Sequence, residues 1–220
     1  MSIYLCTGLE AVGGDALAAA MPQLPVYRQR RAARYLRLQD RVLSAAAYLL
    51  LRYALADTCA LTALPDFSYG PYGKPYFAEY PEIRFSFSHT ADAVLCAVYA
   101  CGETGADIQC PEPLSVEICG MFLSEPEQSV VRLSPDLSSD LIRLWTVKEA
   151  YCKYTGRGLH SALRDTDFSA VFRHRQFTWN GIPFQCGTVQ EKTWCCCGLR
   201  NARVHAVPAH TLFHFEEENQ

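Results

Sequence analysis

Two acidic residues and a lysine stand at spacings that suit phosphate chemistry. Glu149 and Lys153 are four residues apart in a segment with a helical pattern, which puts them one turn apart on one face. Asp107 and Gln109 flank Ile108 in a short predicted strand, so they share a face of it. Mg²⁺ prefers one or two carboxylates and completes its shell with water and phosphate oxygens. A surface Glu–Lys pair and a solvated edge-strand aspartate are the simpler interpretations that remain open.

Side chains that could hold phosphate occur earlier in the chain. Arg28 and Arg31 lie on one side of a predicted helix, and arginine binds phosphate through a planar fork of donors. Lys74 sits in a Gly-Lys-Pro turn, which is stiff and can present an ammonium to an anion. Ser88 and His89 end an alternating strand, where adjacent residues point to opposite faces and cannot form a nucleophile–base pair. A solvated basic face, a plain turn and a turn-capping histidine are the open alternatives.

The hydrophobic periodicity predicts the elements that position these residues. The helix that carries Glu149 is expected to begin around Ser138-Ser139-Asp140 and to end at Gly156. Other helices are predicted at 15–22, from 25 through the arginines, at 40–56, at 116–123 and at 125–133. Strands are predicted at 2–9, 83–90, 93–99, 105–109, 168–172, 176–179, 184–189, 194–199 and 204–207, with a loop-rich stretch at 57–82.

Composition bounds the class of protein. The chain has 220 residues, half of them hydrophobic, which suits one large or two small globular domains. A net charge of -3 argues against general nucleic-acid binding. No apolar run reaches the roughly 18 residues of a membrane span, and we see no signal peptide. We therefore expect a cytoplasmic protein that acts as a monomer, away from membranes.

The 11 cysteines are expected to be free thiols. Their number is odd and no Cys-x-x-Cys pair occurs, which disfavours both a disulfide framework and a structural zinc site. Several lie in apolar runs, where a free cysteine behaves as a small hydrophobic residue.

The motifs follow one another in an order that resembles a known family. Along the chain come the basic helix, Gly-Lys-Pro, Phe-Ser-Phe-Ser-His, Gly-x-Asp-Ile, Phe-Leu-Ser-x-x-Glu and Trp-Thr-x-Lys-Glu-Ala-x-x-Lys. This series resembles the 4'-phosphopantetheinyl transferase superfamily, and within it the larger, pseudo-dimeric type related to the surfactin-synthetase activating enzymes. The resemblance runs from about residue 3 to about residue 207. It implies an enzyme that moves the phosphopantetheine arm of coenzyme A onto a serine of an apo acyl or peptidyl carrier protein, releasing adenosine 3',5'-bisphosphate.

The resemblance also implies roles for individual residues. Those that match the family's coenzyme A contacts are Arg28, Arg31, Lys74, Ser88, His89 and Lys153. The implied Mg²⁺ ligands are Asp107 and Glu149, with Gln109 where many members have glutamate, and Mn²⁺ is an alternative ion. Asp107, Glu149 and Lys153 are the implied catalytic residues, and Glu149 is the candidate base for the carrier serine. Because Gln109 adds no charge, it puts metal affinity and preference in doubt.

The implied fold is α+β, with two similar halves related by pseudo-twofold symmetry, each with a small antiparallel sheet. The expected halves are residues 1–104, on the coenzyme A phosphate-binding side, and 105–220, on the metal-binding and catalytic side. The active site would lie in the cleft between them. Residues 111–135, with Met121 and Phe122, are candidate contacts for the carrier protein, and an ordinary core helix is the alternative.

Two other functions compete with transfer. An inactive relative could bind coenzyme A or a carrier protein without transfer, and Gln109 is the feature that favours it. A zinc- or redox-active cysteine protein is the third, and the cysteine spacings disfavour it.

Overall fold

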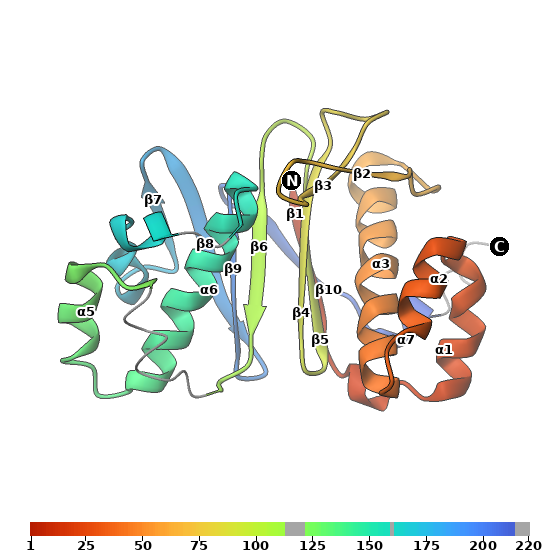
Figure 1. Cartoon of the computed structure of the whole chain (residues 1–220), viewed down its shortest axis with the longest axis horizontal. Helices are drawn as coiled ribbons and strands as arrows, with labels where there is room; N and C mark the ends of the chain where they lie inside the picture. The colour runs from red at the N-terminus through yellow and green to blue at the C-terminus, as the bar shows by residue number, and fades with distance from the viewer. Residues whose placement is uncertain (113–121, 159–160, 214–220) are drawn as a thin grey trace.

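The computed structural model describes residues 1–112, 122–158 and 161–213. Two four-stranded sheets pack against each other at the centre of the molecule, and helices cover the outer face of each (Figure 1). The mixed α+β class expected from the sequence is confirmed. The pseudo-twofold relation between the halves stays a prediction.

The first sheet has the order β10-β1-β5-β4. Its strands are β1 (Ser2–Cys6), β4 (Arg84–Thr90), β5 (Ala93–Tyr99) and β10 (Arg203–Ala206). The helices beside it are α1 (Gly14–Ala20), α2 (Val26–Ala33), α3 (Leu38–Cys59) and α7 (Ala209–Phe213), with short 3-10 turns at Leu9–Ala11 and Met21–Gln23. Strand β10 pairs parallel with β1, so the chain returns to this sheet near its end. The predicted boundary at 104/105 falls where β6 begins. The chain passes from the second half back to the first when β10 joins the first sheet.

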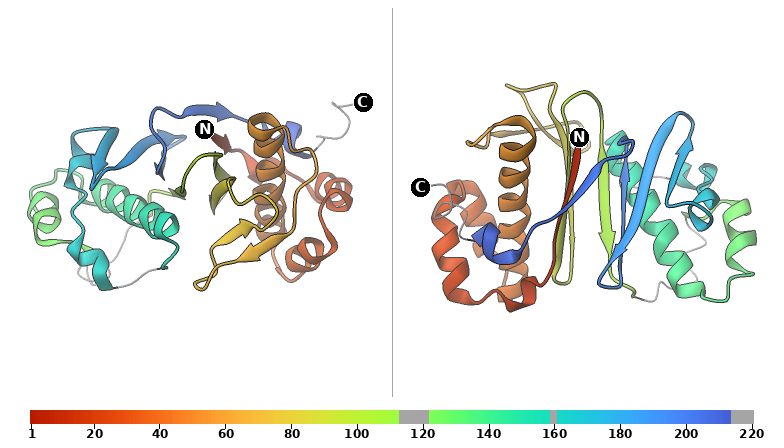
Figure 2. Two further views of the ribbon diagram at one scale, coloured as in Figure 1. Left: turned by 90° about the horizontal axis from the view of Figure 1, so that it is seen from above. Right: turned by 180° about the vertical axis from the view of Figure 1, so that it is seen from behind.

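Helix α3 is the core helix of this half, as its periodicity predicts. It is long and apolar enough to cross a membrane by length and composition alone, but 61% of that window is buried inside the protein. Leu50 and Leu51 are fully buried, and the side of α3 that faces the sheet packs against β1, β4 and β5. The helix is hydrophobic nearly all round because it lies between the sheet and α1, α2 and α7. Figure 2 shows this packing from above and from behind.

The second sheet has the order β6-β9-β8-β7, all antiparallel. Its strands are β6 (Gly105–Gln109), β7 (Gln176–Trp179), β8 (Ile182–Val189) and β9 (Lys192–Cys197). The helices on this side are α5 (Glu125–Val131) and α6 (Leu137–Thr155), with 3-10 turns at Ser161–Asp165 and Ser169–Phe172. A short hairpin of β2 (Phe67–Tyr69) and β3 (Pro75–Phe77) projects beside α3 (Figure 1).

The alternation of side chains along the strands explains the layers. In β9, Cys196 packs between the sheets with Ile108 and Leu95, whereas Cys195 and Cys197 belong to the cluster beneath α6. All three thiols are fully buried. The Cys195–Cys197 run therefore fills both faces of a central strand, as small apolar residues do.

Three local predictions need correction. Residues 168–172 were expected as a strand, but Ser169–Phe172 is a 3-10 turn, because Asp167 accepts the Ser169 amide at 2.9 Å and bends the chain. The loop-rich stretch at 57–82 contains the β2–β3 hairpin. The helix that carries Glu149 begins at Leu137, slightly earlier than expected, because Asp136 rather than Ser138 or Ser139 caps it. The predicted helix at 116–123 lies largely outside the described residues.

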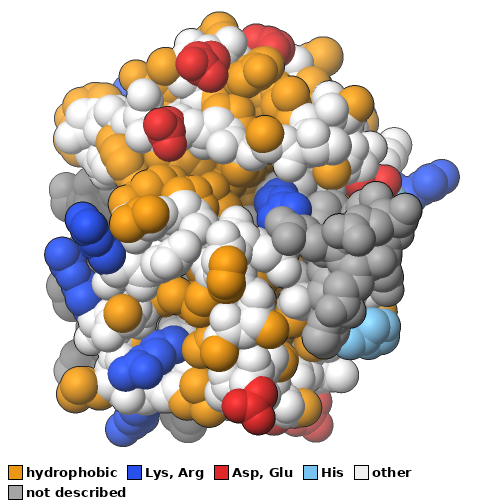
Figure 3. All heavy atoms as spheres, turned by 90° about the vertical axis from the view of Figure 1, so that its right-hand side faces the viewer, with side chains coloured by type: hydrophobic (Ala, Val, Ile, Leu, Met, Phe, Trp, Pro, Cys, Tyr) orange, Lys and Arg blue, Asp and Glu red, His pale blue; other side chains and the backbone are white. Residues whose placement is uncertain are grey.

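On the face that carries α1 and α2, the surface mixes hydrophobic side chains with separate basic and acidic ones (Figure 3).

Candidate active site

Asp107 is the centre of a buried polar cluster where the two sheets meet. Its side chain is almost fully buried, and its Oδ1 accepts hydrogen bonds from Ser88 Oγ at 2.8 Å and Lys153 Nζ at 2.6 Å. Its Oδ2 accepts from Gln109 Nε2 at 2.9 Å. Ser86 adds a second link between the sheets, because its Oγ accepts the Ala106 amide of the edge strand β6. The side chains of Ser86 and Ser88 on β4 thus make hydrogen bonds along the edge of β6 that has no neighbouring strand in its sheet, and Ser88 holds the Asp107 carboxylate there.

Helix α6 brings Lys153 and Glu149 to this cluster. Close approach of the helix to β6 requires Gly105, since a Cβ there would collide with the Ala150 carbonyl oxygen. Lys153 pairs with Asp107 across the two elements. Within the described residues, neither a hydrogen bond nor an ion pair holds Glu149. The simple surface Glu–Lys pair is therefore not what the structure contains.

The surroundings of Glu149 raise the pKa of its carboxyl group. The largest cause is loss of hydration, the second is the negative charge of Asp107, and Lys153 opposes both. Two carboxylates thus lie close enough to repel, with one ammonium as partial compensation. This donor set fits a hard divalent cation that takes one or two protein carboxylates.

Gln109 departs from the expected ligand role. It directs its amide nitrogen, not its oxygen, to Asp107. The described residues hold no group of three or more His, Cys, Asp or Glu side chains arranged to bind a metal ion. Asp107 and Glu149 are therefore the acidic groups that could hold the ion, with water and substrate oxygens as the further ligands.

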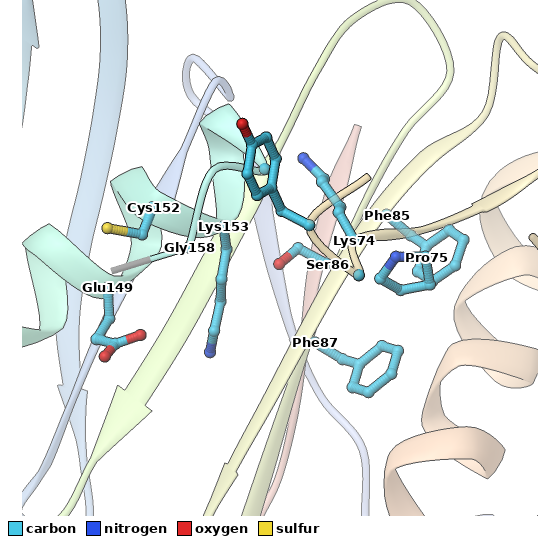
Figure 4. Close-up of a pocket in the computed structure, with 12 residues that line it drawn as sticks. Lys74, Pro75, Phe85, Ser86, Phe87, Glu149, Cys152, Lys153 and Gly158 are labelled. Carbon is cyan, nitrogen blue, oxygen red and sulfur yellow. The ribbon is translucent and has the colours of Figure 1, made fainter. Parts of the chain in front are cut away.

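A pocket of about 240 Å³ opens beside Glu149 and Lys153. Both side chains extend from α6 toward this space, and Ser86 and Phe87 of β4 lie across from them (Figure 4). A second pocket of the same size is lined by Arg28, Arg31 and His89 among others. The two pockets share the lining residues Gly73, Pro75 and Phe87, so they are neighbours along one surface.

Arg28 is prepared to bind an anion. The side chain is buried, stacks over the Tyr48 ring and donates through Nη2 to the Ser44 carbonyl at 3.2 Å. Its Nε is buried and has no hydrogen-bond partner among the residues that the structure describes. Burial, and then the charge of Arg31, lower the pKa of Arg28. A phosphate in the second pocket would supply both a negative charge and an acceptor.

His89 lies at the rim of the same pocket. It points to the opposite face of β4 from Ser88, as expected for neighbours on a strand. Loss of hydration is the main cause that lowers its pKa, with further contributions from the positive charges of Lys153 and Arg31. An anion bound near His89, Lys153 and Arg31 would raise the pKa of His89 and favour its imidazolium form.

Lys74 does not present its ammonium to either pocket. Its Nζ donates to Glu103 Oε1 at 2.7 Å, to the Thr104 carbonyl at 2.9 Å and to the Tyr154 carbonyl at 3.0 Å. These bonds use all three protons. The aliphatic part of Lys74 lines the first pocket, but its end points away from the Lys153 ammonium (Figure 4).

The most buried charges of the site region are two motif residues to which the sequence analysis assigns no role. Lys148 and Glu127 form an ion pair at 2.9 Å with both side chains 0% exposed. Lys148 also donates to the Leu163 and Thr166 carbonyls, and Glu127 accepts the Phe168 amide. Loss of hydration lowers the pKa of Lys148, and Glu127 opposes this. Lys148 precedes Glu149, so this pair fixes α6 to α5 and to the turn at Phe168.

The fold and the site together define an α+β protein with two neighbouring pockets, one lined by Arg28, Arg31 and His89 and the other by Glu149 and Lys153. Comparison with known proteins agrees. The model of the 4'-phosphopantetheinyl transferase superfamily matches residues 103–208, which include Asp107, Glu149 and Lys153. This match, together with relatives named 4'-phosphopantetheinyl transferases that include Sfp and gsp, confirms the resemblance to this superfamily and to its Sfp-like type that the motifs predict.

Three relatives show how far the similarity extends. A 4'-phosphopantetheinyl transferase of Bacillus subtilis is 29% identical over 160 residues, which are 71% of this chain and 70% of that protein. The 4'-phosphopantetheinyl transferase Sfp of Bacillus subtilis strain 168 is 36% identical over 95 residues, 42% of each chain. The 4'-phosphopantetheinyl transferase gsp of Aneurinibacillus migulanus is 30% identical over 139 residues, 60% of this chain and 56% of that one. The match thus spans between two fifths and about two thirds of these relatives' lengths.

Proposed function

We propose that this protein transfers the 4'-phosphopantetheine arm of coenzyme A to a serine of an apo acyl or peptidyl carrier protein, with Mg²⁺ as the cofactor. The observation that carries the proposal is the pair of neighbouring pockets, with an unpartnered arginine nitrogen in one and a carboxylate pair with a lysine in the other. Coenzyme A has phosphate at two separate places, a 3'-phosphate and a pyrophosphate. The proposal keeps the cytoplasmic, monomeric setting expected from the sequence.

Binding of the donor begins with the cations. Arg28, Arg31 and His89 hold the 3'-phosphate, because Arg28 has an unused donor and all three line one pocket. Lys153 lies beside the pyrophosphate, where it can leave Asp107 and neutralise charge on the leaving group. Ser88, the other residue expected to contact coenzyme A, donates its hydroxyl to Asp107 and lines neither pocket, so its role in this proposal is to hold Asp107 in place.

The transfer step needs a base and a charge sink. The carrier serine oxygen forms a bond to the phosphorus that bears the pantetheine arm, and the P–O bond to the adenosine 3',5'-bisphosphate breaks. Glu149, which lines the first pocket, takes the serine proton directly or through a water molecule. A divalent ion held by Asp107 and Glu149 would neutralise the pyrophosphate oxygens and polarise the phosphorus. Gln109 adds no charge to this centre.

The structure describes only part of the segment 111–135, which was expected to contact the carrier protein. Residues 113–121, which include Met121, lie outside the described residues. Phe122 is buried and packs edge-on against the Trp145 ring at 5.0 Å, so it belongs to the core rather than to a docking surface. The alternative weighed for this segment, a core element, is correct at Phe122.

Mass spectrometry tests the proposal directly. The protein is incubated with coenzyme A, Mg²⁺ and several apo carrier proteins, and a gain of one phosphopantetheine arm on a carrier is expected. Glu149→Gln should abolish the gain, whereas the exposed Glu79→Gln should retain it. Tight binding of coenzyme A, measured by calorimetry, with no change in the mass of any carrier would instead favour the inactive relative.

A further inference from the structure

We infer that Lys74 is a positioning residue that joins the first half of the protein to the end of the active-site helix, rather than a ligand of coenzyme A. Its ammonium is held by three oxygens of the protein, and two of them belong to the segment Glu103-Thr104 that leads into β6. The third is the carbonyl of Tyr154, in the last turn of α6. The inference deepens the proposed function, since the geometry fixed in this way is that of the proposed site.

The base of the Lys74 side chain is fixed by its turn. Gly73 has a φ of 83°, a conformation that favours glycine, and Pro75 begins β3. The Gly70 amide donates to the Lys74 carbonyl at 2.9 Å, which closes the hairpin. The side chain therefore leaves a rigid platform in the first half of the chain.

The end of the side chain is fixed by its acceptors. A helix leaves its last carbonyls without intrahelical partners, and a cation there also complements the helix dipole. Lys74 satisfies the Tyr154 carbonyl, one residue after Lys153. Gly156 leaves room for this, because a Cβ there would lie 3.1 Å from Lys74 Cδ. The lysine thus acts as a C-terminal cap supplied from a distant part of the chain.

Glu103 completes the arrangement without approaching the substrate pockets. Its Oε1 accepts from the Thr104 amide as well as from Lys74, and its Oε2 lies 3.9 Å from Arg84 Nε. It lines neither of the two pockets of the site. Removing its charge should disturb the Lys74 position but cannot remove a contact to coenzyme A. This gives a variant that separates the two roles.

The experiment is a double-mutant cycle of Lys74→Met and Glu103→Gln, with the exposed Glu82→Gln as control. If Lys74 positions α6, each single change should lower kcat by about tenfold or more, since displacement near the chemistry is costly. The Kd for coenzyme A should stay within about twofold, and the double variant should be no worse than the worse single one. Lys74→Arg, which keeps the charge, should recover part of kcat.

A direct contact between Lys74 and a phosphate of coenzyme A predicts that the Kd changes rather than kcat. Lys74→Met would then raise the Kd for coenzyme A by about ten- to a hundredfold, and Glu103→Gln would leave the affinity unchanged or increase it. That result overturns the inference, as does an unchanged kcat in both variants. If Lys74→Met does not fold, Lys74→Gln takes its place in the cycle.

A readout that needs no activity keeps this test separate from the proposed function. Amide hydrogen exchange of peptides covering residues 150–158 should speed up in Lys74→Met and Glu103→Gln but not in Glu82→Gln, because the last turn of α6 loses its partner. Unchanged exchange would contradict the positioning role even if no carrier were modified by the wild-type protein. Absence of transfer by the wild type, with faster exchange in both variants, would count against the proposed function alone.

Discussion

The Lys153 ammonium lies 2.6 Å from Asp107 Oδ1, on the same oxygen that accepts from Ser88. This oxygen belongs to one of the two carboxylates assigned to the metal ion, so in the free protein a side-chain cation already neutralises it. A metal ion and Lys153 compete for Asp107 unless a phosphate draws the lysine away. If the site binds metal and coenzyme A as proposed, the two binding events are therefore coupled.

Lys153→Met should tighten binding of the metal alone and slow transfer. Without the competing ammonium, the affinity for Mn²⁺ in the absence of coenzyme A should rise by about tenfold, or ~1.4 kcal/mol. Electron paramagnetic resonance titration of free Mn²⁺ measures this. The matched control is Lys192→Met, which removes an ammonium 2.9 Å from Asp92, outside the site. Equal or weaker Mn²⁺ binding in Lys153→Met would contradict the competition.

Gln109→Glu should strengthen metal binding and lower the thermal stability of the metal-free protein. The change adds a negative charge beside Asp107 and removes the amide hydrogen bond to it, so the Tm without metal should fall. With Mn²⁺ present, the affinity should rise by about three- to tenfold, because a further carboxylate joins the site. Thermal unfolding with and without metal checks both effects, with Gln176→Glu on the exposed edge strand as control. A lower metal affinity would refute the idea that Gln109 weakens an otherwise intact centre.

Glu149→Gln should raise the stability of the metal-free protein near pH 8 while abolishing transfer. Loss of hydration, and then Asp107, raise the pKa of Glu149 in the folded state. The stabilising protonated form is fully present below the unfolded pKa of about 4.3 and is lost as the pH rises through the higher folded pKa. The wild type should therefore lose stability relative to Glu149→Gln as the pH rises, and the difference should close below about pH 4. Tm values measured across this range decide, and a gap that does not depend on pH would show that the carboxyl group is not perturbed.

Arg28→Met should weaken coenzyme A binding selectively. The lost charged hydrogen bond corresponds to ~1.5–3 kcal/mol, so the Kd should rise by about ten- to a hundredfold. Dephospho-coenzyme A lacks the 3'-phosphate, and its affinity should hardly change. Calorimetric titration of both compounds compares Arg28→Met with the exposed Arg34→Met, which should behave like the wild type. A similar loss for both ligands would place the 3'-phosphate elsewhere.

Lys148→Met should be strongly destabilising, because it leaves Glu127 buried without its partner. The expected loss in the free energy of unfolding is about 3–5 kcal/mol, measured by urea denaturation. Adding Glu127→Leu should recover part of it, since the unpaired charge is removed. Arg143→Met, which breaks a surface pair of 3.6 Å with Asp140, should cost less than about 1 kcal/mol. A loss from Lys148→Met as small as that would mean that water reaches Glu127.

Local patterns account for the parts of the fold that the sequence predicted well. Gly156 ends α6 as its conformational freedom predicts, and alternation along 83–99 identifies β4 and β5. The strand expected at Phe168 failed because Asp167 and Glu127 hold the two amides there in a turn, and hydrophobicity alone does not reveal this.

The candidate site was predictable in its members but not in their partners. The order of the motifs brought Asp107, Glu149 and Lys153 together, yet helical spacing suggested that Lys153 would pair with Glu149 rather than with Asp107. The acceptors of Lys74 are 29 to 80 residues away along the chain, two of them backbone carbonyls. A sequence pattern carries no signal for a contact of that kind.

Strand β10 has a consequence for how the molecule can be divided. The strand comes from the last fifth of the chain, but it forms the outer edge of the sheet that begins at Ser2. No single cut between the halves yields two pieces with complete sheets, because one piece always lacks a strand that the other carries. The chain therefore passes between the two halves twice, once before β6 and once before β10, so the first half cannot be expressed as one continuous segment with its sheet complete.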